Sequence, residues 1–273
     1  MIEDTKQTTD SDIQDILSLL ESANKLFKRR SISISDQKYD SFNSLFLYYR
    51  EVFLESYINL FNAIYKNKDD IFTEFSFRTL LEMGVEDSFI IFSNKVPEKE
   101  KRNYILLTIL SEYGFSSMKS ENFRKWFDEI FNENVNLLSP IQITQLHQYT
   151  KVLKTKTINR AYVKKLRDVR RLIFKKKKEI IDRLMLKDQD LFDIEVILSG
   201  HSHILHGNPI LLKELFMKDK KDHISPLMLY LKISGFEMLK NVSEYLNNPN
   251  FRDKVDNLYI NKNRPHKRGL FKW

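Results

Sequence analysis

Most hydrophobic positions of this chain recur at steps of three and four residues, the spacing that lines one face of an α-helix. In residues 11–29 the pattern includes Ile13, Ile16 and Leu20. Alternation of apolar and polar residues, the pattern of a strand, occurs only at Ser31–Ser35, which we interpret as a loop. The sequence therefore predicts an all-α protein.

Capping residues and prolines divide this pattern into roughly eight to ten helices, which we expect to form a helical bundle. Ser139-Pro140, Asn208-Pro209 and Ser225-Pro226 each pair a capping residue with a proline at the first helical position. A final turn is expected at Asn248-Pro249. The predicted helices cover residues 11–29, 36–67, 70–94, 97–114, 120–131, 139–149, 157–186, 188–206, 208–216 and 225–246.

The length of 273 residues fits one large domain or two small ones. We divide the chain into an N-terminal helix and loop at 1–35, a single helical domain at 36–260 and a basic tail at 261–273. Residues 97–150 form a candidate small helical insert. The chain has only 6 glycines and 6 prolines, which agrees with long uninterrupted elements.

Composition excludes several classes of protein. The chain has no cysteine, so disulfide and thiolate chemistry are excluded. Residues 1–12 lack the apolar core of a signal peptide, and no window approaches the roughly 18 apolar residues of a membrane span. We therefore expect a cytoplasmic protein that does not enter a membrane.

The formal net charge of +8 is concentrated in one segment. Residues 151–183 hold 14 Lys and Arg against 3 Asp and Glu, and most lie in the predicted helix 157–186. One side of this helix forms a packing seam of Tyr162, Leu166, Val169, Ile173, Ile180 and Leu184. The other side carries Lys164, Arg167, Arg171, Lys175 and Lys178.

This cationic side predicts contacts with the phosphates of RNA or another polyanion. A solvated helix face, an acidic protein partner and an anionic membrane surface are the alternatives. Aromatic residues are few, with only Tyr162 and Phe174 in the helix, so stacking of single-stranded bases is not strongly indicated.

Three of the chain's 6 histidines lie in the segment 201–206. On a helix, His203 and His206 share a face with Ser202, whereas His201 points elsewhere. A last-turn position favours the protonated form of His206, which suits a proton donor or a phosphate contact. Two alternatives are histidines serving only packing, and a metal site. The spacing argues against zinc, because a helix would need ligands from another element.

A second polar pair, Arg78 and Glu82, lies four residues apart on the predicted helix 70–94. Together, Phe77-Arg78-x-Leu80-Leu81-Glu82 and Ser202-His203-x-x-His206-Gly207 resemble a group of all-helical bacterial proteins similar to the HEPN superfamily. The resemblance covers roughly residues 36–246. HEPN nucleases also carry an arginine followed four to six residues later by histidine on one helix, a pair that this sequence lacks.

The resemblance implies a HEPN-like core and an RNA-directed defence or toxin-type protein, with a metal-independent ribonuclease as one form. The implied site joins Arg78, Glu82, Ser202, His203 and His206. Arg78 would bind a phosphate, Glu82 would orient Arg78 or His206, and His206 would exchange protons. We expect no cofactor. A homodimer and a cognate antitoxin or defence-system partner are compatible with this interpretation.

Two other functions remain open at this point. The first is a non-catalytic module that binds nucleic acid or nucleotides through the basic helix. The second is a helical interaction scaffold, in which Arg78, Glu82 and His206 serve only to pack two helices together.

Overall fold

The computed structural model describes residues 2–30, 42–68, 73–116, 135–144, 160–185 and 220–263. These residues are almost entirely helical and contain no strand, so the predicted all-α class is confirmed for them. Eight α-helices have their bounds within these ranges: α1 (Ile2–Arg30), α2 (Phe42–Lys66), α3 (Thr73–Leu81), α4 (Ser88–Phe92), α5 (Glu98–Ser116), α8 (Arg160–Ile180), α11 (Lys220–Leu246) and α12 (Pro249–Asn263). None of these helices is long and apolar enough to cross a bilayer.

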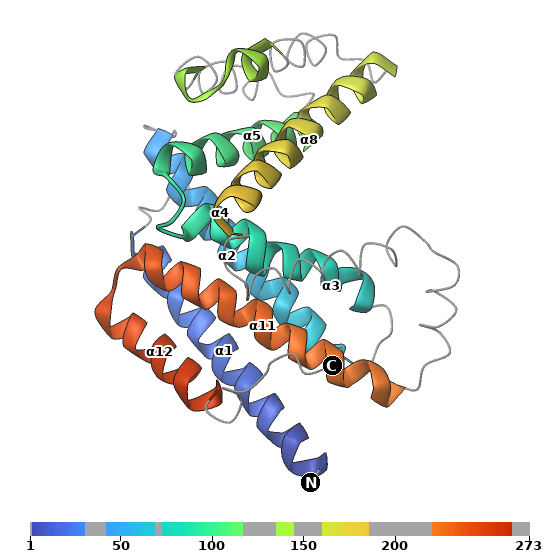
Figure 1. The fold of residues 1–273 in the computed structure, drawn as a ribbon, viewed down its shortest axis with the longest axis vertical. Helices are drawn as coiled ribbons and strands as arrows, with labels where there is room; N and C mark the ends of the chain where they lie inside the picture. Colours follow the sequence, from blue (N-terminus) through green and yellow to red (C-terminus); the bar gives the residue numbers. More distant parts are fainter. Residues whose placement is uncertain are drawn as a thin grey trace.

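The core is built around α1 and α11, which lie side by side along much of their length (Figure 1). The predicted apolar stripe of α1, from Ile13 through Leu20 to Phe27, is buried. The ring of Phe27 stacks on Tyr245 of α11, with 5.5 Å between ring centroids. The N-terminal helix therefore belongs to the same hydrophobic core as the rest of the described bundle.

The helix predicted at 70–94 is one rod with a change of winding in its middle. α3 passes into a π-helical segment, η1 (Glu82–Asp87), and then into α4. Gly84 lies in η1, where α11 approaches so closely that an added Cβ would lie 2.0 Å from the Ser234 Oγ. Ser234 in turn bonds the hydroxyl of Tyr57 over 2.8 Å. The wider turn thus occurs where the rod meets α11.

A second layer consists of α5, α8 and the segment 135–144 (Figure 1). α8 packs on α5 and ends in a second π-helical segment, η3 (Ile181–Met185). The 3-10 turn η2 (Val135–Leu137) leads into a helix that starts after Ser139. Gln142 N–H donates to Ser139 Oγ over 3.3 Å, and Ser139 N–H donates to Gln142 Oε1 over 2.8 Å. This reciprocal cap confirms the predicted helix start at Ser139-Pro140.

Near the C-terminus, one predicted helix start and the predicted length of another helix are wrong. α11 begins at Lys220, so Pro226 lies inside the helix. A proline there removes one hydrogen bond but has a φ angle compatible with a helix, so residues before it can still be helical. At Asn248-Pro249 the structure has the 15-residue helix α12 in place of a single turn. Asn248 caps it, because its Oδ1 accepts from Phe251 N–H over 3.1 Å.

Two helices extend beyond their predicted bounds. α1 begins at Ile2, well before residue 11, and α12 continues to Asn263 into the predicted basic tail. The predicted helices 120–131, 188–206 and 208–216 lie outside the described residues.

Candidate nucleic-acid interface

The basic helix α8 has an outer and an inner side with different roles. Val169 and Ile180 of the predicted seam are fully buried, and Ile173 packs against the core. Successive residues of an α-helix are turned by about 100°, so residues 167, 171, 175 and 178 point away from this seam. These four side chains are exposed, and we call them the cationic face: Arg167, Arg171, Lys175 and Lys178.

The cationic face has few acidic neighbours. Its one recorded ion pair joins Arg171 to Asp168 over 3.9 Å, and the Arg171 side chain is still 74% exposed. Arg167, Lys175 and Lys178 form no ion pair within the described ranges. The face extends over about 16 Å of helix at about 1.5 Å per residue. It therefore presents concentrated positive charge to solvent.

The inner basic residues of the same run anchor α8 to the bundle. Lys176 Nζ lies 3.3 Å from a Glu100 carboxylate oxygen, and Arg183 reaches the same carboxylate at 2.6 Å. Burial would favour neutral Glu100, but Arg183 and Lys176 outweigh this effect and lower its pKa. Glu100 is thus held ionised between two cations of α8 and η3.

Lys177 makes the most enclosed of these contacts among the described residues. Its Nζ lies 2.6 Å from Glu86 and 2.8 Å from Asp87, and all three side chains are largely buried. Burial alone would lower the pKa of Lys177, but the carboxylates of Asp87, Glu86 and Glu82 outweigh it and raise the pKa. Tyr104 completes the cluster by donating its hydroxyl to Asp87 over 2.9 Å.

The π-helical winding of η1 explains why these carboxylates gather. Hydrogen bonds in a π-helix join residues five apart, so positions four and five after a given residue flank the same face. Glu86 and Asp87 hold these positions relative to Glu82. In a regular α-helix Asp87 would be turned about 140° from Glu82. The wider turn therefore directs both carboxylates toward Lys177.

Arg78 and Glu82 are in contact, as their spacing predicted. The Nε of Arg78 donates to Glu82 Oε1 over 2.6 Å. The Arg78 and Glu82 side chains are 25% and 31% exposed, so solvent reaches this pair. No partner for the terminal guanidinium nitrogens is recorded among the described residues. The pair is thus fixed in orientation by one strong bond, and within the described ranges the terminal nitrogens of Arg78 have no acceptor.

The remaining predicted site residues lie wholly or partly outside the described part of the chain. Lys164 lies on α8, but its side chain is outside the described part. Ser202, His203 and His206 also lie outside the described residues, so the predicted meeting of His206 with Arg78 stays a prediction. Within the described ranges, no group of His, Asp and Glu is arranged to hold a metal ion.

A cavity of about 350 Å³ borders the cationic face between α5, α8 and the segment 135–144. Its lining includes three lysines, Lys99, Lys175 and Lys176. On its inner wall Asn103 and Gln142 exchange amide hydrogen bonds of 3.1 and 3.3 Å. These amides fix the 135–144 segment to α5, so this wall is held in place by the scaffold.

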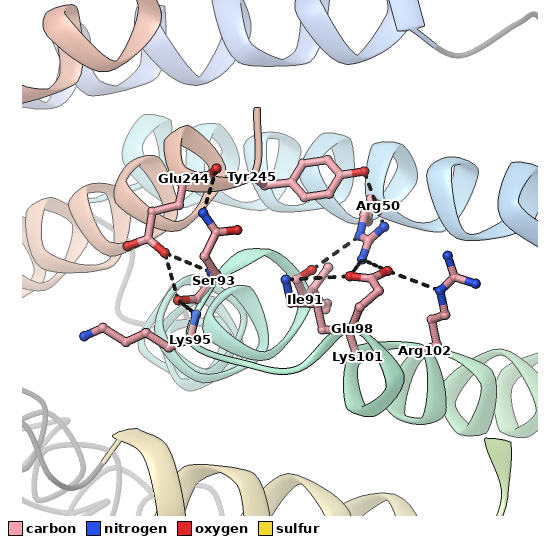
Figure 2. A network of polar contacts seen from close by, with 10 residues as sticks. Arg50, Ile91, Ser93, Lys95, Glu98, Lys101, Arg102, Glu244 and Tyr245 are labelled. Carbon is pink, nitrogen blue, oxygen red and sulfur yellow. Dashed lines mark hydrogen bonds and ion pairs between the residues drawn. The ribbon is translucent and has the colours of Figure 1, made fainter. Parts of the chain in front are cut away.

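A separate polar network joins α2, α4, α5 and α11 (Figure 2). Buried Arg50 donates to Ile91 O over 3.3 Å, to Tyr245 Oη over 3.3 Å and to Glu98 over 3.1 Å. Glu244 accepts from Ser93 Oγ over 2.9 Å. These contacts tie α2 and α11 to each other and to the chain around the turn between α4 and α5, which is a structural role.

Sequence reasoning missed Arg50, Glu86, Asp87 and Lys177. The sequence did hold one signal for Lys177, since helical spacing puts it on the seam side of α8. No protein-family model matches the chain, and neither the curated proteins nor the solved structures include a detectable relative.

Proposed function

We propose that this protein binds the phosphate backbone of nucleic acid, with RNA as the expected ligand, through the cationic face of α8. The division of the basic run supports this most directly. Lys176, Lys177 and Arg183 pair with carboxylates of the bundle, whereas the four residues of the cationic face remain exposed. A helix that only needed anchoring would not require these additional cations.

Phosphate contacts of this kind confer affinity without reading base sequence. Each neutralised phosphate releases counterions, so the observed affinity falls steeply as salt rises. We therefore expect binding at low ionic strength that weakens with added salt. The slope of log K against log salt concentration reports the number of phosphate contacts. Its magnitude is about 0.7 per contacted phosphate on a single strand and about 0.9 on B-form duplex DNA.

The test is a charge-reversal variant read by fluorescence anisotropy of a labelled RNA. Combining Arg167→Glu, Arg171→Glu and Lys178→Glu should weaken binding and reduce the magnitude of the salt slope by about 2 on a single strand. The matched control combines Lys95→Glu, Arg252→Glu and Lys254→Glu, which are exposed cations away from α8. Equal losses in both variants would show that net charge is responsible and would reject α8 as the interface.

A second candidate is the HEPN-like, metal-independent ribonuclease of a defence or toxin system. The solvent-accessible Arg78–Glu82 pair favours it, because a partly exposed guanidinium suits a phosphate. In this proposal His206 exchanges a proton at a ribose 2′-hydroxyl, with Ser202 and His203 beside it. Glu82 orients Arg78.

Cleavage of cellular RNA in the presence of EDTA tests this second candidate. Activity should be lost in His206→Ala and in Arg78→Ala. Unchanged cleavage by His206→Ala would exclude the proposed proton transfer. Induced expression should also slow growth of the host, and His206→Ala should relieve that effect if cleavage causes it.

A further inference from the structure

The aromatic side chain of Phe174 lies along one edge of the cationic face, between Arg171 and Lys175 in the chain. Phe174 is 67% exposed, the highest exposure among the large hydrophobic side chains described. On a regular helix it is within about 60° of Arg167, Arg171 and Lys178. It does not belong to the packing seam, because the neighbouring Ile173 is turned about 100° from it and packs against the core.

We propose that the cationic face selects single-stranded nucleic acid, and that Phe174 is the residue on which a base stacks. The inference rests on the proposed binding of nucleic acid through α8. It adds a preference for single-stranded over duplex nucleic acid. The row of cations beside this projecting ring holds the backbone while the ring receives one base, which is the combination used by sequence-tolerant single-strand binders.

A duplex cannot use this feature. Its bases are stacked on one another, so an aromatic ring on a helix surface meets backbone and groove edges. A single strand can turn a base outward onto the ring, and every base offers a π face. Phe174 therefore contributes to affinity for single strands and hardly at all for duplexes, whereas the four cations contribute to both.

The experiment compares a single-stranded RNA with a duplex of the same length, for the wild type and three variants. Phe174→Ala should weaken single-strand binding by roughly 5- to 150-fold, the range for loss of one stacked base. Duplex binding should change less than about twofold. Phe174→Leu keeps an apolar side chain without a π face and should lose as much as Phe174→Ala, whereas Phe174→Tyr should retain affinity.

A spectroscopic arm reports stacking directly. Phe174→Trp should bind the single strand as the wild type does, and its emission should be quenched on binding. The wild type already carries Trp126 and Trp273. The change in their emission on binding is therefore measured in the wild type and subtracted. Tyr259→Ala removes an exposed aromatic side chain from α12 and should leave affinity unchanged.

The outcomes separate this inference from the proposed function. If Phe174→Ala binds both the single strand and the duplex as tightly as the wild type, stacking is overturned. The cationic face would then remain a surface that binds only the phosphate backbone. Affinity retained in Phe174→Leu would also overturn stacking, because an apolar contact alone would then suffice. Absence of binding to either RNA by the wild type would overturn both proposals.

Discussion

The ammonium group of Lys177 lies 2.6 Å from a carboxylate oxygen of Glu86 and joins the basic helix α8 to the π-helical segment η1. Asp87 lies 2.8 Å from the same ammonium. α8 is thus attached to the bundle by basic residues, and it also presents basic residues to solvent on its other side. Anchoring and charge presentation can therefore be separated by substituting single lysines of one run.

We expect Lys177→Ala to lower the free energy of unfolding by about 3 kcal/mol, the low end for breaking a buried ion pair. The loss arises because Glu86 and Asp87 would remain enclosed without their cation. Lys178→Ala, one residue later on the cationic face, should change the free energy of unfolding by less than about 0.5 kcal/mol. Urea unfolding followed by circular dichroism measures both, and equal effects would contradict the division of α8 into two sides.

Gly84→Ala should destabilise the fold, by about 1–3 kcal/mol if the neighbours can shift. Its Cβ would lie 2.0 Å from Ser234 Oγ and 2.9 Å from the Ser234 carbonyl oxygen. The carbonyl belongs to the α11 backbone and cannot rotate away. Thr79→Ala on the exposed side of α3 is the control, and its melting temperature should stay near the wild-type value. A Gly84→Ala protein as stable as wild type would refute the close approach.

Glu98 should contribute to the pH dependence of stability. Burial would favour its neutral form, but Arg50, Lys101 and Arg102 outweigh this and lower its pKa in the folded protein. In the unfolded chain a glutamate titrates near about 4.3. The stabilisation is therefore present above about pH 4.3 and is lost as the pH falls through the lower folded pKa.

The measurement is urea unfolding between pH 7 and pH 3 for the wild type and Glu98→Gln. The variant should be less stable than wild type at pH 7, and the difference should shrink below about pH 4. Asp253→Asn, at an exposed carboxylate of α12, should show no such convergence. A stability gap for Glu98→Gln that is constant with pH would contradict the role of its charge.

Arg78→Ala should lower the free energy of unfolding by less than about 1 kcal/mol, because its ion pair is partly exposed. This separates a functional from a structural role for the residue. Loss of RNA cleavage at nearly unchanged stability would support a contact with phosphate. A stability loss as large as that of Lys177→Ala would instead identify the pair as a packing element of the rod.

Sequence periodicity predicted the two sides of α8 well, because the burial of Val169 and Ile180 follows from helical spacing alone. It also predicted the Arg78–Glu82 contact, which depends on one helix. The partners of Lys177 were not predictable in this way. Glu86 and Asp87 lie about ninety residues earlier, and their direction depends on the winding of η1, which local propensity does not specify.

The same reasoning separates good from poor boundary predictions. Ser139-Pro140 was interpreted correctly, because Gln142 completes a local cap. Ser225-Pro226 was not, because the signal for a helix start is also compatible with a proline inside one. A composite site involving His206 depends on tertiary packing and stays a prediction.

The pairing of α1 with α11 has a consequence for synthesis of the protein. The buried stripe of α1 packs on residues that follow it by about two hundred positions in the chain. At about 5 to 20 residues per second, α11 emerges roughly ten to forty seconds after α1. Until then the buried stripe of α1 can pack on α2 but lacks the cover that α11 supplies, such as Tyr245 on Phe27. The nascent chain is therefore expected to depend on chaperones during this interval, and chains cut before α11 should aggregate.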